Sequence, residues 1–227
     1  YIIDEPIIHY QDSPNVLIQQ TLDLGLGNLS DSGALCVRTG KFTGRSPENK
    51  YFVKDAITEN KIFWGEVNHP VSQEVYEKLH AKMIAFFAQK DLYIQDVAAC
   101  ADPVYRLNIR VLTEFPWSAL FAHNMFLRLN SKELKKFSAD WTILCAPNFK
   151  ANPSVDGVQS EQFIIINFTE KSILIGGTAY TGEIKKGIFT VLNFLLPVQH
   201  NVFPMHSSAN VGAKGDEAIF FGLSGTG

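Results

Sequence analysis

The sequence predicts an α/β (α+β) fold in which a mixed β-sheet is flanked by helices, and three observations predict it. The spacing of apolar residues alternates along the chain between a period of two and a period of about 3.6, as it does where strands and helices alternate. Several apolar runs are short and rich in β-branched or aromatic residues, which is typical of central strands. The chain has 227 residues and is 46% hydrophobic, so it can bury a sizeable core.

Three segments have the helical spacing, with apolar residues on one face: 75–90, 117–127 and 184–196. The first has Ser72 or Gln73 near its start, and the second follows Pro116. Pro197 follows the third segment and is expected to end that helix, because a proline cannot donate the next backbone hydrogen bond.

Six short segments are predicted as strands: 92–94, 107–111, 141–145, 163–168, 173–175 and 218–221. In the second, Asn108 and Arg110 alternate with apolar residues, which indicates a strand with one buried face. The last is expected to be a buried strand that leads into a glycine-rich turn, and residues 212–216 are expected to form a tight turn before it. The Asn-, Pro- and Ser-rich stretch 145–162 is predicted to be a loop.

Charge and cysteine content exclude several classes of protein. Twenty Lys and Arg against 23 Asp and Glu give a net charge of −3, which disfavours nucleic acid as a partner. No apolar run approaches the roughly 20 residues that a membrane span needs. The three cysteines lie far apart and form no CxxC pair, so neither a disulfide framework nor a cysteine-based zinc site is indicated. We expect a cytoplasmic protein that binds neither nucleic acid nor membrane.

The strongest motif is the glycine-rich segment GLSGTG at residues 222–227, directly after an apolar strand. It supplies the first six positions of a P-loop, in which glycines let backbone N–H groups converge on phosphate oxygens. The lysine and hydroxyl residue that complete the motif would follow Gly227. An ordinary glycine turn is an equal alternative from these residues alone. Because the chain starts at Tyr1 and stops within the motif, we expect it to be a fragment.

A basic pair, Lys185 and Lys186, lies at the start of the third predicted helix. Successive helical residues are about 100° apart, so at most one of the two lysines faces a given cleft. The neighbouring positive charge and burial both favour the neutral form of the inward lysine, and a neutral amine can bind a metal ion or carry a proton. An exposed basic pair at a helix start is the alternative, and these residues alone favour it.

Two further segments carry side chains that could bind a ligand. His206 lies among small polar residues before the last strand, where a neutral imidazole can bind a metal ion or phosphate. Arg45 lies in a Gly- and Pro-containing loop, where its guanidinium could bind a carboxylate through two hydrogen bonds. A structural histidine and a solvated arginine are the alternatives.

Taken in order, five segments closely resemble the ATP-dependent phosphoenolpyruvate carboxykinases, and the match runs over essentially the whole chain. The segments are TGRSP (43–47), TEFPWSALFAHNMFLR (113–128), IGGTAYTGEIKKGIF (175–189), MHSSANVG (205–212) and GLSGTG (222–227). The spacing between the lysine pair, the histidine segment and the glycine loop fits the family as well.

The resemblance implies the N-terminal domain of the carboxykinase fold, with residues 1–200 as the substrate-binding domain and residues 201–227 as the truncated start of the P-loop nucleotide-binding domain. It also implies a gluconeogenic lyase: oxaloacetate loses CO₂, and the resulting enolate takes the γ-phosphoryl group of ATP to give phosphoenolpyruvate and ADP. The oligomeric state stays unknown.

The resemblance further implies a set of site residues. Arg45 would bind the substrate carboxylate, Tyr180 would lie beside the substrate, and Lys185 would stabilise the developing charge. Lys186 and His206 would be Mn²⁺ ligands that also border the ATP site, and Lys186 would contact the substrate. ATP, accompanied by Mg²⁺, would be wrapped by Gly222, Leu223, Ser224, Gly225, Thr226 and Gly227.

The family's P-loop lysine and threonine, the aspartates of its metal site and a second substrate-binding arginine would lie after Gly227. The fragment is therefore expected to be inactive alone and to bind ATP weakly. Two alternatives stay open: a P-loop kinase that phosphorylates a hydroxyl acceptor, and a folded fragment that binds without catalysis.

Overall fold

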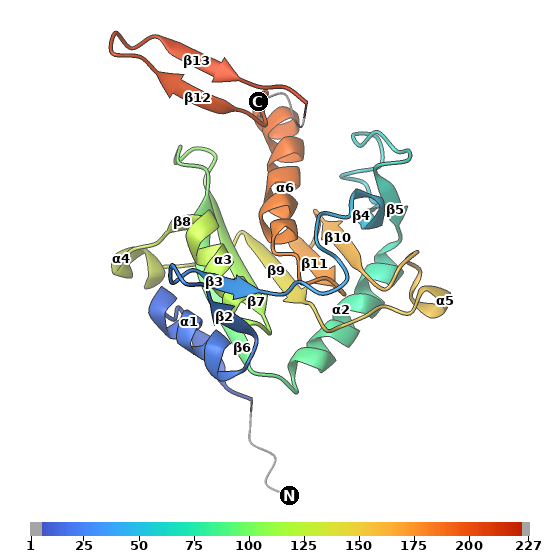
Figure 1. Cartoon of the computed structure of the whole chain (residues 1–227). Coiled ribbons are helices and arrows are strands. Elements are labelled where there is room, and N and C mark those ends of the chain that lie inside the picture. The colour runs from blue at the N-terminus through green and yellow to red at the C-terminus, as the bar shows by residue number, and fades with distance from the viewer. Residues whose placement is uncertain (1–5, 224–227) are drawn as a thin grey trace, which may run out of the picture. The chain divides into compact units, whose positions relative to one another are not determined.

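A computed structural model of the chain describes residues 6–223. The described chain divides into two compact units, a larger one that ends at Phe189 and a smaller one that begins at Thr190. The helices are α1 (Pro14–Asp23), α2 (Gln73–Phe87), α3 (Pro116–Met125), α4 (Ser131–Leu134), α5 (Pro153–Asp156) and α6 (Gly182–His200) (Figure 1). The strands are β1 (Ile8–Tyr10), β2 (Gly27–Leu29), β3 (Leu35–Val37), β4 (Lys50–Val53), β5 (His69–Val71), β6 (Leu92–Ala99), β7 (Leu107–Thr113), β8 (Leu127–Arg128), β9 (Trp141–Ala146), β10 (Phe163–Asn167), β11 (Ser172–Gly176), β12 (Ser208–Val211) and β13 (Glu217–Phe220).

The larger unit is built on one mixed sheet, as the sequence predicts. Its strand order among the described residues is β1-β6-β7-β9-β11-β10-β4-β5, with β8 paired to β6. Strand β6 is antiparallel to β7, and β10 is antiparallel to β11, whereas β7, β9 and β11 run parallel. Strand β10 lies inside the sheet between β11 and β4, and its three successive isoleucines, Ile164 to Ile166, have no exposed surface. Such continuous burial is typical of strands covered on both faces.

Helices cover both faces of this sheet. Leu79 and Met83 of α2 are fully buried in a cluster that includes Leu174 of β11. The first half of α6 approaches the neighbouring residue Ile173 at Gly187, where an added Cβ would lie 3.0 Å from the Ile173 side chain. Because adjacent strand residues point to opposite faces, α2 and the start of α6 lie on opposite sides of β11. Helices α1 and α3 lie side by side (Figure 1) and pack on Tyr93 of β6.

Most predicted elements are confirmed with small shifts at their ends. Helix α2 starts after Ser72, whose hydroxyl accepts a hydrogen bond from the backbone N–H of Val75, as an N-cap residue does. The prediction that the second helix continues to Leu127 is wrong. Phe126 leaves the helical conformation (φ −107°, ψ 171°), and the residues after it pair with the edge of β6 as β8.

The expected stop at Pro197 is also wrong, because α6 continues to His200. A proline removes one backbone hydrogen bond without preventing the following residues from continuing the helix. The helix ends where Asn201 adopts a left-handed conformation (φ 55°) and the N–H of Val202 bonds back to the carbonyl of Leu196 at 3.0 Å. Asparagine is one of the few residues that take this conformation readily at a helix end.

In the smaller unit, the last predicted strand exists but is not buried. Strands β12 and β13 form an antiparallel hairpin, and Ile219 and Phe220 keep 53% and 59% of their surface exposed in the described chain. A two-stranded hairpin has no second layer of its own to cover its apolar side chains. The predicted tight turn is confirmed, since the N–H of Gly212 bonds to the carbonyl of Asp216 at 2.7 Å and Gly215 has φ +80°.

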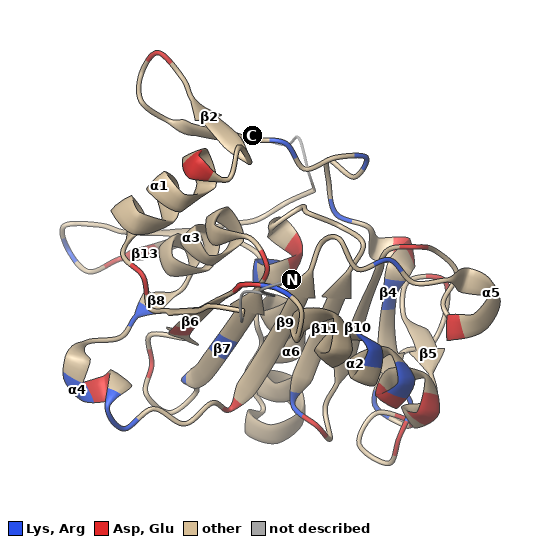
Figure 2. Ribbon diagram, turned by 90° about the horizontal axis from the view of Figure 1, so that it is seen from below, with Lys and Arg blue, Asp and Glu red and all other residues tan. Residues whose placement is uncertain are grey.

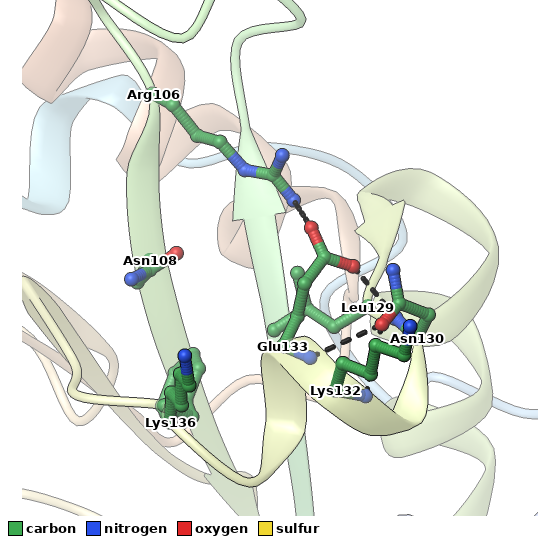
Figure 3. A pocket seen from close by; sticks show the side chains of 8 residues that line it. Arg106, Asn108, Leu129, Asn130, Lys132, Glu133 and Lys136 are labelled. Atoms are coloured by element: carbon green, nitrogen blue, oxygen red, sulfur yellow. Dashed lines mark hydrogen bonds and ion pairs between the residues drawn. The ribbon is translucent and has the colours of Figure 1, made fainter.

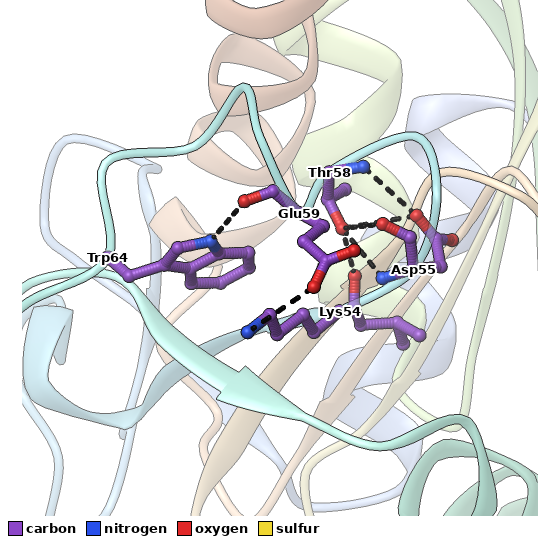
Figure 4. A network of polar contacts seen from close by, with 6 residues as sticks. Lys54, Asp55, Thr58, Glu59 and Trp64 are labelled. Carbon is purple, nitrogen blue, oxygen red and sulfur yellow. Dashed lines mark hydrogen bonds and ion pairs between the residues drawn. The ribbon is translucent and has the colours of Figure 1, made fainter.

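A polar network fixes the turn that follows β4, and its main residues are seen in Figure 4. One carboxylate oxygen of Asp55 accepts hydrogen bonds from the N–H groups of Ile57 (2.9 Å) and Thr58 (3.1 Å), and the other accepts one from the Thr169 hydroxyl (2.7 Å). Burial raises the pKa of Asp55, but the hydrogen bonds outweigh burial and hold the pKa below its ordinary value of 3.8. Asp55 therefore stabilises this turn as an anion.

We expect Asp55→Ala to lower the free energy of unfolding by about 1 to 2 kcal/mol at neutral pH, because the N–H groups of Ile57 and Thr58 and the Thr169 hydroxyl lose their charged acceptor. A group whose pKa is lowered by folding stabilises fully above its unfolded pKa and loses that effect as pH falls through its folded pKa. Denaturant unfolding should therefore show a constant gap between variant and wild type down to about pH 5, and a shrinking gap below about pH 4. A gap independent of pH would contradict this role, and Glu66→Ala, an exposed acid of the same segment, is the control.

Candidate functional site

The predicted substrate arginine lies in an anchored loop between β3 and β4. Arg45 itself is exposed, whereas the next residue, Ser46, is held at two atoms. Its backbone N–H donates to Oε1 of Glu183 at 2.8 Å. Its hydroxyl oxygen accepts from the side-chain amides of Asn49 (2.8 Å) and Gln162. Blue segments recur in Figure 2 along the path that leads from β3 to β4, so this loop is basic as well as anchored.

Tyr180 lies in the turn between β11 and α6, and two glycines shape this turn. Gly177 has φ +71°, and a Cβ there would lie 2.4 Å from the carbonyl oxygen of Glu161. At Gly182 a Cβ would lie 2.4 Å from the Tyr180 ring. The ring of Tyr180 therefore packs on the backbone of the first turn of α6, where only glycine leaves room for it.

The two lysines point differently, as helical geometry predicts. Lys185 is exposed and Lys186 is half-buried, with its Nζ 4.6 Å from the centre of the Phe189 ring. Burial lowers the pKa of Lys186, and the positive charges of Arg45, Lys185 and Lys50 lower it further. This is the direction that the sequence predicts for the inward lysine, and it increases the fraction of uncharged amine that could bind a metal ion.

Two residues of this region, Glu183 and Lys50, were not predicted as site residues from the sequence. Glu183 is only 3% exposed, and burial raises its pKa, while the Ser46 N–H, Lys50 and Arg45 act in the opposite direction. Burial lowers the pKa of Lys50, Glu183 raises it and Arg45 lowers it. Glu183 lies two residues before Lys185, so an acid in the same helical turn as the lysine pair was the feature of the sequence that could have indicated it. The arrangement is a cluster of cations around one buried carboxylate.

The smaller unit brings other predicted residues together. His206, Gly222 and Leu223 line one pocket of about 500 Å³, together with Phe203, Pro204, Met205 and Phe221. The histidine is therefore close to the start of the glycine segment, as the predicted nucleotide site requires. The predicted residues Ser224, Gly225, Thr226 and Gly227 lie outside the described residues.

The part of the chain that the structure describes offers candidate metal-ligating atoms but no complete metal site. Within residues 6–223 no group of three or more His, Cys, Asp and Glu side chains could hold a metal ion. The candidate nitrogen donors are the amine of Lys186 and the imidazole of His206, and both suit a first-row divalent ion when uncharged. Lys186 belongs to the larger unit and His206 to the smaller one.

A separate hollow of about 480 Å³ lies beside α4, and its lining includes the cations Arg106, Lys132 and Lys136. Figure 3 shows the guanidinium of Arg106 directed at the carboxylate of Glu133, 3.1 Å away. Glu133 also accepts a hydrogen bond from the N–H of Asn130, which in turn caps α4. These polar groups satisfy one another, and we assign this hollow no function.

The family model for phosphoenolpyruvate carboxykinase, in its ATP form, matches residues 7–227. The chain belongs to this family. The phosphoenolpyruvate carboxykinase (ATP) of Christiangramia forsetii is 57% identical over the whole chain, and the chain covers 43% of that protein. That of Flavobacterium johnsoniae is 53% identical over 99% of the chain, which covers 42% of it, and that of Geobacillus kaustophilus is 49% identical over the whole chain, which covers 43% of it.

The chain therefore spans less than half the length of these carboxykinases. Its mixed sheet with flanking helices agrees with the N-terminal part of the carboxykinase fold, which the sequence predicts. In the described part of the chain, no helix is both long and apolar enough to cross a membrane.

Proposed function

We propose that the whole protein to which this chain belongs is an ATP-dependent phosphoenolpyruvate carboxykinase that converts oxaloacetate and ATP to phosphoenolpyruvate, CO₂ and ADP, a gluconeogenic step. The observation that carries the proposal is the cationic cluster of the larger unit, in which Arg45, Lys50 and Lys186 come from separate segments and act on one another electrostatically. A doubly charged anion such as oxaloacetate suits such a cluster. Membership of the carboxykinase family supports the same assignment.

The reaction breaks the bond between the departing carboxylate carbon and its neighbour, and the electron pair stays on the substrate as an enolate. The enolate oxygen then attacks the γ-phosphorus of ATP, and ADP leaves with the electrons of the broken P–O bond. We propose that Arg45 binds a substrate carboxylate, that Tyr180 positions the substrate against α6, and that Lys185 stabilises the charge that develops on the enolate.

We propose further that Lys186, as an uncharged amine, and His206 hold Mn²⁺, and that residues 222–227 wrap the phosphates of ATP, which carries Mg²⁺. The lowered pKa of Lys186 and the place of His206 beside Gly222 support these roles. A bound divalent ion would supply positive charge next to the enolate oxygen. Phosphoryl transfer otherwise depends mainly on alignment and on charge neutralisation by the surrounding residues.

We propose residues 1–200 as the substrate-binding domain and residues 201–227 as the start of the nucleotide-binding domain. The exposed apolar residues of β12 and β13 support this, because such side chains are normally covered by further strands or helices. The division between the two units of the structure falls inside α6, before the proposed boundary. We also propose the cytoplasm as the location, where the unpaired cysteines Cys36, Cys100 and Cys145 would stay reduced.

The proposal is tested by oxaloacetate- and ATP-dependent formation of phosphoenolpyruvate, measured on the full-length protein and on residues 1–227 alone. The full-length protein should turn over in the presence of Mn²⁺ and Mg²⁺. The 227-residue chain should show no turnover and should bind ATP weakly, because it spans only 43% of its relatives. Turnover by this chain at the rate of the full-length protein, or no turnover by the full-length protein, would contradict the proposal.

A further inference from the structure

One buried carboxylate joins the two segments that carry Arg45 and Lys186. Glu183 lies in the first turn of α6 and is 3% exposed, and its Oε1 accepts the backbone N–H of Ser46 at 2.8 Å. A charge-assisted hydrogen bond at this distance, partly shielded from water, is stronger than a fully exposed one. Because the donor is a backbone group, the bond fixes the path of the chain immediately after Arg45.

The surrounding charges explain why a carboxylate stands at this position. A buried anion is costly unless hydrogen bonds and opposite charges compensate it. Glu183 has both, in the Ser46 N–H and the positive charges of Lys50 and Arg45. Those cations in turn repel one another and Lys186. Glu183 therefore offsets the repulsion that would otherwise move the Arg45 loop away from α6.

A second anchor holds the same loop independently. The Gln162 side chain is 4% exposed and donates to the hydroxyl of Ser46, which also accepts a hydrogen bond from Asn49. The loop thus stays attached through a side chain when the bond to Glu183 is removed. Loss of Glu183 should change the position of Arg45 without unfolding the loop.

We infer that Glu183 is a positioning residue, which keeps the Arg45 loop against the first turn of α6 so that Arg45 and Lys186 act on the same substrate anion. The inference rests on the proposed function for its substrate. We assign Glu183 no contact with substrate or metal, and it acts through Ser46 and the charges around it.

The test compares Glu183→Ala, Glu183→Gln and the control Glu48→Gln, which changes an exposed acid of the same loop, in the full-length protein. Glu183→Ala removes both the hydrogen bond and the charge, and we expect its KM for oxaloacetate to rise at least tenfold. Glu183→Gln keeps an acceptor oxygen and should raise this KM by about threefold, which corresponds to a smaller loss of binding energy. The KM for ATP should stay within about twofold in both variants, and the control should match wild type.

A second readout follows the loop without any substrate. Trypsin cleavage of the folded protein after Arg45 should be at least tenfold faster in Glu183→Ala than in wild type. An unchanged KM for oxaloacetate in folded Glu183→Ala, equal rises in both KM values, or loss of folding in both variants would overturn the inference. A wild-type protein without oxaloacetate turnover would instead overturn the proposed function, and the trypsin rates would then decide whether Glu183 holds the loop.

Discussion

Lys186→Ala is expected to abolish oxaloacetate-dependent formation of phosphoenolpyruvate, with kcat/KM lower by about a thousandfold or more. Burial and the positive charges of Arg45, Lys185 and Lys50 lower the pKa of this half-buried amine, which favours its proposed role as an uncharged nitrogen donor to Mn²⁺. Alanine keeps the helix, since it has the highest helical propensity, but it removes this donor. The measurement is steady-state turnover with saturating ATP and varied oxaloacetate.

The same variant separates a carboxykinase from a P-loop kinase that phosphorylates a hydroxyl acceptor. Such a kinase needs the glycine loop but neither decarboxylation nor this amine, so it would keep most of its activity. Lys61→Ala removes the same charge from an exposed position and should leave turnover unchanged. Turnover by Lys186→Ala within a few-fold of wild type would contradict the assigned role.

Gly177→Ala is expected to lower the free energy of unfolding by about 3 to 5 kcal/mol, from backbone strain and overpacking together. Gly177 has φ +71°, a conformation that side-chain-bearing residues rarely adopt. A Cβ there would also clash with the backbone, since it would lie 2.4 Å from the Glu161 carbonyl oxygen and 2.9 Å from Cα of Gln162. Neither neighbour is the end of a flexible side chain. Relief of the clash would push on the segment whose Gln162 holds the Arg45 loop, so substrate affinity should fall as well. Urea unfolding measures the first effect.

Gly33→Ala is the matched control. Gly33 has φ +82°, and a Cβ there would meet nothing within 4 Å, so this substitution tests the left-handed conformation alone. We expect it to cost about 1 to 2 kcal/mol. Equal losses at the two glycines would mean that the close approach to Glu161 contributes nothing.

Five strands of the large sheet and three of the six helices in the described chain could be predicted, because buried residues recur with the period of a strand or of a helix. The three successive isoleucines of β10 are typical of a buried strand, and the apolar face of α2 is typical of a helix. Ends of elements depend on interactions that the local pattern does not contain. Leu127 continues an apolar helical spacing, yet it pairs with the edge of β6 as part of a strand. Helix α6 continues past Pro197 and ends at Asn201, which adopts a left-handed conformation. Phe220 looks like a core residue in the sequence, whereas its exposure in β13 depends on what packs against the hairpin.

Some residues of the candidate site could be predicted from the sequence, and others could be found only in the structure. Arg45, Tyr180 and the lysine pair lie in recognisable motifs, because each needs particular neighbours in the sequence to shape its loop or turn. Glu183 and Lys50 became visible only in three dimensions, since their significance comes from burial and from charges on distant segments. A local sequence pattern can show that a lysine stands beside an acid, but it cannot show that a serine N–H from another loop bonds to that acid.

A manganese ion in crystals of the full-length protein, grown with phosphoenolpyruvate and Mn²⁺, can be located by its anomalous scattering, and its position tests the proposed site directly. We expect a peak within bonding distance of Nζ of Lys186 and of an imidazole nitrogen of His206, with the carboxylate of phosphoenolpyruvate bound to the guanidinium of Arg45. A manganese peak remote from both Lys186 and His206, with Arg45 facing solvent, would contradict the proposed site.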